Sequence, residues 1–452
     1  MTGASLTAAP PASDRWIGLA GRAPVLALAA AALLAISVKL FLVFTPNEMD
    51  AFWIYSWAVN LVDHGIRADR FFYPNDLVGG TYVFSMIPTA LIAAVYALMG
   101  HGYWTVFVAN ELWLLLILAA FYGFLRAEFD YRPVTALTMA IVLCLMEPVL
   151  RGVVSLRAET LSLAATLIAL LCVRRPRLVW LGGALAVLAV EIHATGVIGA
   201  GFVALRVLLD RMGLRALVQL ALGGVLGMAL FWALHPDMVS LRWLHDLGGR
   251  QGTNGIRSPL AAYFWHAQYK RHLPELACIG LAGAIMLHAR SLPQIWNEAR
   301  EPILQIVLAV VLLELLGRGS YLYVVWIFVP FYLLALRIRP SALLPLLAFH
   351  LASYLALMLY NGDYSHARLA AAIRRVAAPN MLVLGPHPAL PGAPTPDQYV
   401  WLPEDAEIAP QIRGLSRPVL VVGRTSRPDV TPVDRVGGFS IGWMKSPQGD
   451  AR

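Results

Sequence analysis

The chain has 452 residues, of which 59% are hydrophobic and only 14% are charged, with a formal net charge of +8. Soluble domains are roughly 45–50% apolar and about 25% charged, so the composition excludes an ordinary soluble protein and indicates a polytopic membrane protein. The positive charge falls in short clusters between apolar runs, which indicates membrane topology rather than nucleic-acid binding. The three cysteines all lie within apolar runs, so we expect neither a disulfide framework nor a thiolate metal cluster.

The first apolar run, residues 23–44, is longer than the roughly 7–15 residues of a signal-peptide core, so we predict a retained span that starts in the cytoplasm. Cytoplasmic loops carry the excess of Lys and Arg, and the clearest such marker is Arg174–Arg177. With every basic cluster on one side, the chain crosses the membrane eleven times and its C-terminal segment lies outside. The predicted spans are 23–44, 104–125, 133–150, 158–173, 178–192, 195–209, 216–234, 273–289, 302–317, 322–336 and 340–358.

The apolar run 81–99 does not fit this count. A span there would place Arg174–Arg177 on the outer side, and Pro88 interrupts the run. We expect this segment to lie along the membrane or to enter and leave on one side; the alternative is an ordinary span with the basic rule broken locally. Residues 45–103 then form one outer loop with two surface helices, roughly 50–64 and 81–99, and the first has the aromatic density of an interfacial helix.

The tail of the chain differs in pattern from the apolar runs. It contains many prolines, a helical segment and short apolar runs typical of strands. The helix is expected at His366–Val376 and the strands at Met381–Leu384, Val419–Val422 and Phe439–Met444. The predicted fold is therefore an all-α polytopic membrane domain over residues 1–358, with a small α/β extracytoplasmic domain over residues 359–452.

Strongly polar side chains collect at the outer ends of the predicted spans. Any one of them alone is readily explained as a snorkelling or topological residue. Together they face the same side as Asp50, which closely follows the first span, and this indicates a shared polar cavity. The candidates for binding a substrate in it are Lys39, Arg157, Glu159, His193, Arg318 and Tyr321.

A sugar carried on a polyprenyl phosphate suits a cavity on the outer face, where nucleotide sugars are absent. Its leaving group is a phosphate that is already stable as an anion, so no general acid is required. One carboxylate, Asp50, then suffices as a general base for an acceptor hydroxyl, whereas a glycosidase needs two. The anionic phosphate needs cationic partners from Arg, Lys, His or a divalent metal.

The segment Asp50–Gly65 resembles the first outer loop of GT-C glycosyltransferases, which include protein O-mannosyltransferases and lipid A aminoarabinose transferases. In that family an Asp, often followed by Glu, opens an aromatic helix that ends in Gly. Three weaker similarities keep the family's order. Leu156–Glu159 resembles its Arg-x-Asp/Glu turn, Ile192–Gly196 its Thr-Lys-x-x-Gly turn, and Gly317–Pro330 its basic-aromatic turn before a Pro-containing helix.

The resemblance covers roughly residues 23–340 and implies a GT-C-like membrane fold. It implies that Asp50 is the catalytic base or a metal-linked carboxylate. It also implies which side chains line the donor phosphate and the acceptor site, namely Arg157, Glu159, His193 and Arg318.

The chain departs from the family pattern at two positions. Ala51 replaces the common second acid, which leaves Glu48 as the other candidate catalytic or metal-binding carboxylate. His193 stands where Lys is usual, so its charge depends on pH and on its neighbours, and Glu191 would favour protonation if the two meet. These departures leave the sugar and the metal requirement open.

We therefore expect a plasma-membrane glycosyltransferase that moves a hexose or pentose from a polyprenyl-phosphate donor to a hydroxyl of a lipid, protein or polysaccharide on the extracytoplasmic face. Membrane lipids are further partners, a divalent metal is the candidate cofactor, and nucleic acid is not expected. Three alternatives stay open: a transporter or flippase, a structural assembly partner, and a polysaccharide polymerase or ligase that uses basic residues of the outer segment 235–273. A transporter would favour ionisable groups at mid-helix and paired halves.

Overall fold

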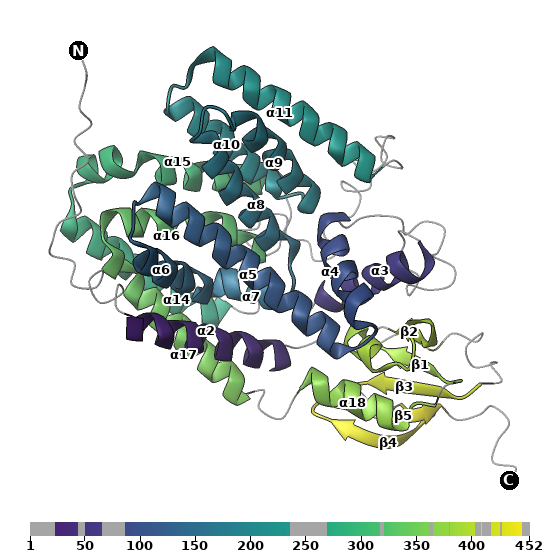
Figure 1. The fold of residues 1–452 in the computed structure, drawn as a ribbon. Helices are drawn as coiled ribbons and strands as arrows, with labels where there is room; N and C mark the ends of the chain where they lie inside the picture. The colour runs from purple at the N-terminus through teal and green to yellow at the C-terminus, as the bar shows by residue number, and fades with distance from the viewer. Residues whose placement is uncertain are drawn as a thin grey trace, which may run out of the picture.

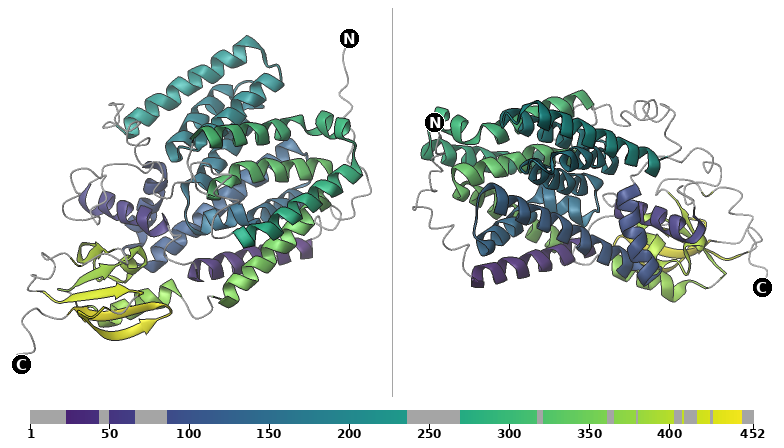
Figure 2. Two further views of the ribbon diagram at one scale, coloured as in Figure 1. Left: turned by 180° about the vertical axis from the view of Figure 1, so that it is seen from behind. Right: turned by 45° about the horizontal axis from the view of Figure 1, so that its top comes forward.

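A bundle of apolar helices with a small sheet at one end forms the structure (Figure 1; Figure 2). The computed structural model describes residues 23–43, 50–65, 86–235, 269–316, 321–360, 365–378, 380–402, 408, 417–424 and 427–444. The bundle contains α2 (Ala23–Val43), α5 (Tyr103–Glu128), α6 (Pro133–Leu145), α7 (Glu147–Val154), α8 (Ala158–Val173), α9 (Val179–Ile192), α10 (Gly196–Leu209), α11 (Gly213–Leu234), α14 (Tyr269–Ala289), α15 (Leu292–Leu316), η3 (Tyr321–Val324), α16 (Val325–Ile338), η4 (Pro340–Leu343) and α17 (Leu344–Tyr360).

The predicted span 133–150 is the one that the structure corrects most. It is broken into α6 and α7, which meet at an angle of 73°. Pro148 has no N–H, and its ring clashes with the carbonyl four residues earlier, so α6 cannot continue through it. The N–H of Met146 instead closes α6 with a 3.2 Å bond to the carbonyl of Leu143. The sequence analysis missed this break because it assigned the span from the length of the apolar run, which continues across the break.

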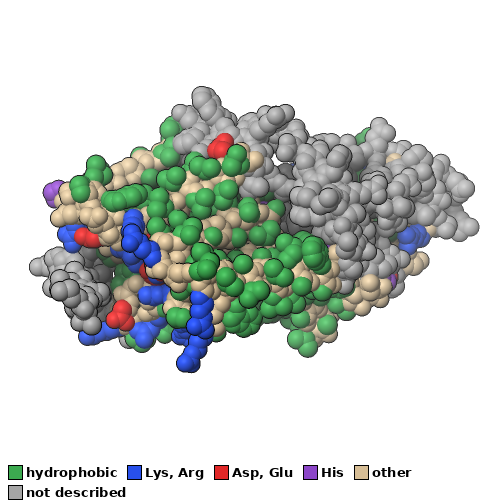
Figure 3. All heavy atoms as spheres, turned by 90° about the horizontal axis from the view of Figure 1, so that it is seen from above, with side chains coloured by type: hydrophobic (Ala, Val, Ile, Leu, Met, Phe, Trp, Pro, Cys, Tyr) green, Lys and Arg blue, Asp and Glu red, His purple; other side chains and the backbone are tan. Residues whose placement is uncertain are grey.

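The arginines that mark the cytoplasmic side meet at one end of the bundle. The Glu128 carboxylate at the end of α5 lies 3.5 Å from the guanidinium of Arg174, 3.2 Å from that of Arg206 and 2.7 Å from that of Arg337. Figure 3 shows that, on the face it draws, most Lys and Arg side chains gather toward one end, beside a broad hydrophobic surface. We call this the arginine end. Its composition agrees with the placement of these clusters on one side of the membrane.

Consecutive bundle segments run between the arginine end and the opposite end. Phe41 near the end of α2 packs on Tyr103 at the start of α5, with ring centroids 5.6 Å apart, so this pair marks the opposite end. By length and composition, four of the described helices can cross a membrane by themselves, or five if the bent pair α6–α7 is one span. The chain is thus an integral membrane protein, and eleven crossings remain a prediction.

Two shorter helices, α3 (Asp50–His64) and α4 (Met86–Met99), lie at the opposite end near the sheet (Figure 2). At 1.5 Å per residue, α4 is about 21 Å long, less than the roughly 30 Å of a bilayer core. Its first N–H, at Met86, donates to Glu191 near the end of α9 over 2.6 Å, and its last residue is followed closely by the start of α5. Both ends of α4 therefore lie at one end of the bundle, and its placement along the membrane remains a prediction. Residues 81–85 of the predicted helix lie outside the described residues.

The tail forms α18 (His366–Val376) and a five-stranded sheet of order β2-β1-β3-β5-β4. β1 pairs in parallel with β2 and β3, whereas β5 is antiparallel to β3 and β4. The predicted helix and three predicted strands are confirmed. The sequence analysis missed two strands at the edges of the sheet, one very short and one rich in polar residues with a proline, as edge strands often are. The strands are β1 (Leu382–Gly385), β2 (Tyr399–Trp401), β3 (Val419–Gly423), β4 (Val430–Val436) and β5 (Phe439–Met444).

The tail docks on α3 and on the turn between α4 and α5. His64 at the end of α3 lies 3.0 Å from the Asp397 carboxylate, and His366 of α18 packs edge-on against Phe52. Arg374 donates to the carbonyl of His101 over 3.3 Å, while the His101 ring lies 2.9 Å from the hydroxyl of Tyr55. The tail thus holds the helix that Asp50 begins.

Close backbone approach between α9 and α11 depends on glycine. A Cβ at Gly223 would lie 1.7 Å from the carbonyl oxygen of Trp180, whereas a Cβ at the adjacent Gly224 would meet only Val187, at 4.0 Å. Small residues that let helix backbones approach are a general device of membrane bundles. Substituting each of these two neighbouring glycines in turn therefore separates the effect of packing on stability from the effect of helix propensity.

We expect Gly223→Ala to force the two helices apart and to lower the free energy of unfolding by about 1–3 kcal/mol, the usual cost of overpacking. Gly224→Ala is the matched control, and it should be neutral or stabilising because Ala favours helix over Gly. Thermal unfolding of both variants in detergent measures the difference. Equal melting temperatures for the two variants would contradict the packing described.

The docking of the tail should weaken in acid. Burial of the His101 ring, with the Arg374 guanidinium nearby, lowers the pKa of this histidine to about 4, although the Leu390 and Ala393 carbonyls and Asp63 oppose the shift. Below its ordinary pKa of about 6.5, an undocked His101 binds a proton that the docked one resists. The docked state therefore loses stability as the pH falls from about 6.5 toward 4.

His101→Gln keeps a hydrogen-bonding side chain but cannot titrate, so it isolates this effect from the histidines at 64 and 366 in the same interface. Between pH 6.5 and 4.5 the melting temperature of the wild type should fall relative to that of this variant, because only the wild type loses the stabilisation linked to His101. Parallel curves over that range would refute the assignment.

Candidate functional site

A sharp turn between α7 and α8 places two of the predicted site residues. Leu156 has a left-handed backbone, with φ of 50°, and its N–H bonds to the carbonyl of Val153 over 2.8 Å. Such a conformation is costly for a leucine and persists here because the side chain is fully buried. The chain reverses at this point, so that Arg157 caps α8 and Glu159 lies in its first turn.

Arg157 and Glu159 form a close ion pair. The Arg157 Nε donates to the Glu159 carboxylate over 3.1 Å, and Nη2 donates to the same group. Glu159 is only 2% exposed, so its charge depends on this partner. The second neighbour of Glu159 is His193 at the end of α9, whose Nε2 lies 3.7 Å from the carboxylate.

The hydrogen bonds of Thr195 define the state of His193. The Trp326 indole N–H donates to the Thr195 hydroxyl over 2.9 Å, so this hydroxyl is free to donate its own proton to His193 Nδ1, 2.7 Å away. The Thr195 backbone N–H donates to the same nitrogen over 3.2 Å. Because Nδ1 accepts, the neutral ring carries its proton on Nε2, toward Glu159. The ring of Tyr323 packs 5.4 Å from His193 and covers it.

The structure therefore brings together three of the six predicted substrate-binding residues, Arg157, Glu159 and His193, at the end of the bundle where α3 and α4 lie. It adds Thr195 and Trp326. Sequence reasoning placed both in turns of interest but could not assign their contacts, which join segments more than a hundred residues apart.

Of the other predicted site residues, the structure describes the side chain of Lys39 alone. Lys39 is exposed on α2, and no hydrogen bond or ion pair links it to another described side chain. Asp50 is the first residue of α3 and Tyr321 the first of η3, but both side chains lie outside the described part of the structure. Glu48 and Arg318 lie outside it entirely, as does most of the basic outer segment 235–273.

Glu191 takes a different partner from the one considered in the sequence. Its carboxylate lies 2.7 Å from Nε2 of His235 at the end of α11, and it accepts the Met86 N–H at the start of α4. The carboxylate that faces His193 is Glu159. Glu191 therefore joins three helices around the site rather than acting within it.

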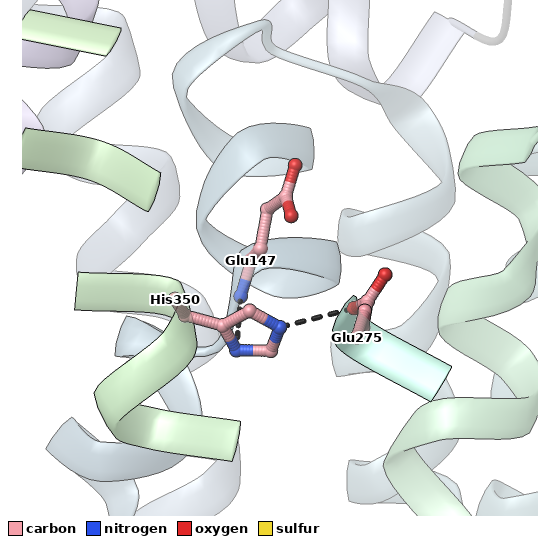
Figure 4. Close-up of side chains that lie close together, drawn as sticks. All are labelled: Glu147, Glu275 and His350. Carbon is pink, nitrogen blue, oxygen red and sulfur yellow. Dashed lines mark hydrogen bonds and ion pairs between the residues drawn. The ribbon is translucent and has the colours of Figure 1, made fainter. Parts of the chain in front are cut away.

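A further polar cluster, which the sequence analysis missed, lies at the break between α6 and α7 (Figure 4). His350 of α17 places Nε2 3.0 Å from the Glu275 carboxylate of α14, and its Nδ1 accepts the Glu147 N–H over 3.3 Å. The Glu147 side chain pairs with Arg151, 3.3 Å away. The sequence signal that could have revealed this cluster is the presence of an ionisable residue inside each of three apolar runs.

The ligand atoms of Glu147, Glu275 and His350 lie within 4.8 Å of one another, a separation that raises the question of a metal. Nδ1 of His350 accepts a backbone N–H, so the ring proton lies on Nε2 and donates to Glu275. No nitrogen lone pair is then directed at an ion. The arrangement fits a clamp that satisfies the first N–H of α7, which the helix break leaves without a partner.

His350→Leu should remove the acceptor of the Glu147 N–H and the donor to the Glu275 carboxylate, and lower the free energy of unfolding by about 3 kcal/mol. Glu275→Gln is the matched control, because its amide oxygen still accepts from Nε2, and we expect a loss below about 1 kcal/mol. Denaturant or thermal unfolding in detergent measures both. A wild-type melting temperature for His350→Leu would exclude the clamp.

Comparison with known proteins identifies the fold. No protein-family model and no curated protein sequence matches the chain. The crystal structure of ArnT from Cupriavidus metallidurans bound to undecaprenyl phosphate matches with a TM-score of 0.56 and 14% identity, over 96% of this chain and 98% of that chain. ArnT in the apo state matches with a TM-score of 0.55 and 14% identity, over 92% and 97%. The GT-C-like fold expected from the sequence is thus confirmed, and this chain has the fold of ArnT.

Proposed function

We propose that this protein is a membrane glycosyltransferase that transfers a sugar from a polyprenyl-phosphate donor to an acceptor hydroxyl on the extracytoplasmic face. The observation that carries the proposal is the end-to-end similarity to ArnT, which was solved with undecaprenyl phosphate. The match covers 96% of this chain, so it includes the membrane bundle and the tail.

The cluster around Glu159 supports binding of the donor phosphate. Glu159 holds the Arg157 guanidinium through two donors, Nε and Nη2, and so fixes the plane in which the guanidinium lies. An oriented guanidinium binds phosphate oxygens more strongly than a mobile one, because less side-chain entropy is lost on binding. Glu159 is thus a positioning residue for Arg157.

His193 has a different role from the lysine that GT-C enzymes usually carry. Its Nδ1 accepts two hydrogen bonds from Thr195, so the ring donates through Nε2 as a neutral group. A neutral donor can contact the phosphate or the sugar without adding a full charge. Arg157 then supplies the positive charge that stabilises the departing phosphate. Lys39, Arg318 or a divalent metal are the additional cations.

Asp50 is the proposed base. It begins α3, which is held in place by α4 and by the docked tail. The acceptor oxygen attacks the anomeric carbon, its proton passes to the Asp50 carboxylate, and the bond from that carbon to the phosphate oxygen breaks with its electron pair on the phosphate. Glu48 is the second candidate carboxylate, and either acid could hold the metal. In this scheme residues 1–358 form the catalytic membrane domain, and residues 359–452 form an extracytoplasmic domain that fixes α3.

The test uses purified full-length protein, a panel of polyprenyl-phosphate sugars, and release of the free lipid phosphate as the readout. Asp50→Asn should reduce turnover by about 10²–10⁴-fold, the usual contribution of a general base, with little change in melting temperature. Asp63→Asn is the matched control on the same helix. The Tyr96 hydroxyl donates to the Asp63 carboxylate over 2.7 Å, and an amide oxygen can accept the same bond, so turnover should stay near that of the wild type.

Full turnover by Asp50→Asn, with any donor, would refute the proposed base. Transport of an intact lipid-linked sugar across vesicles, without release of the lipid phosphate, would instead support the flippase alternative. Either result leaves the fold assignment unchanged.

A further inference from the structure

A groove opens at the arginine end of the bundle, between α14 and the start of α17. It encloses about 710 Å³ and is far from the turns that form the candidate active site, which lie at the opposite end of the same helices. The lining residues are Ala284, Ile285 and His288 of α14, Arg339 and Ser341 beside η4, and Leu344 and Pro345.

The groove is apolar along its walls and basic at its rim. Ala284, Ile285, Leu344 and Pro345 provide the walls, and exposed leucines of α14 extend the apolar surface, since Leu281 is 52% exposed. A water-soluble anion would gain nothing from such a surface. An acyl chain would be buried against it, at about 25 cal/mol for each Å² removed from water.

The rim carries a basic side chain that forms no ion pair with a carboxylate of the described residues. Arg339 is exposed, and its Nε donates to the Ser341 hydroxyl over 3.2 Å. Neighbouring arginines are already paired, Arg337 with Glu128 and Arg290 with Glu298. Among the described residues no carboxylate lies within ion-pair distance of Arg339 or of His288, the second basic side chain of the rim.

Charge and polarity at the groove match one class of ligand. Basic side chains at the end of a membrane helix lie at the depth of lipid headgroups, and basic pockets between helices on the cytoplasmic side bind anionic headgroups. We propose that this groove binds an anionic phospholipid of the leaflet at the arginine end. Its phosphate contacts Arg339 and His288, and an acyl chain lies between α14 and α17. The site is separate from the donor site, which lies at the other end of the bundle.

The experiment measures lipid association with full-length protein in nanodiscs, using phosphatidylglycerol against phosphatidylcholine as probes and native mass spectrometry or a spin-labelled lipid as the readout. Arg339→Gln should reduce the preference for phosphatidylglycerol about five-fold, as expected for one arginine near a headgroup. Arg132→Gln removes an exposed arginine at the same end but outside the groove, so it should leave the preference unchanged.

Ala284→Trp fills the groove from a position that is already exposed, so it tests the acyl-chain half of the proposal without disturbing the core. It should reduce binding of both lipids. The proposal is overturned if Arg339→Gln and Arg132→Gln lower the preference equally, which would indicate a diffuse charge effect. It is also overturned if soluble glycerol phosphate competes as well as the lipid, which would indicate a simple anion site.

Discussion

Inside a membrane, a helix that starts or stops must find partners for its free backbone groups within the protein, because the hydrocarbon core offers none. The described structure meets this constraint with ionisable side chains at three helix starts. His350 accepts the first N–H of α7, Glu191 accepts the first N–H of α4, and His193 accepts the N–H of Thr195 before α10. Each of these side chains is in turn held by a second partner, and one of the three lies in the candidate active site. The polar groups that make chemistry feasible are thus also those that make the broken helices stable.

Charged side chains are arranged differently at the two ends of the bundle. At the arginine end, Glu128 gathers guanidinium groups from three separate helix ends, which ties the loops together and neutralises a buried carboxylate. At the opposite end, Arg157 and Glu159 form a close ion pair, with His193 and the ring of Tyr323 beside it. The first arrangement leaves the paired arginines little capacity for ligands. The second keeps donor groups oriented toward a site where a phosphate could compete for them.

The tail has a mechanical role in this arrangement. Its contacts with α3 and with the turn at His101 involve an ion pair, an aromatic contact and a backbone hydrogen bond, spread over the length of the short helix. An isolated helix of this length would be marginal in water, so its position depends on tertiary packing. Because α3 begins at Asp50, the position of the proposed base depends on the tail, which contributes no proposed catalytic group of its own.

The sequence alone determined that the chain is a membrane protein, which segments are helical, and that α3, α4 and the tail lie at the end of the bundle opposite the arginines. These features follow from apolar length, charge asymmetry and aromatic density, which are local properties. It also pointed to Arg157, Glu159 and His193, because polar residues at the ends of apolar runs stand out. Only the tertiary structure decided that His350 fills the gap at the break between α6 and α7, and that Trp326 holds the Thr195 hydroxyl that lies beside His193. Such contacts join residues one to two hundred positions apart, and their geometry depends on how the helices pack, which periodicity and composition do not encode.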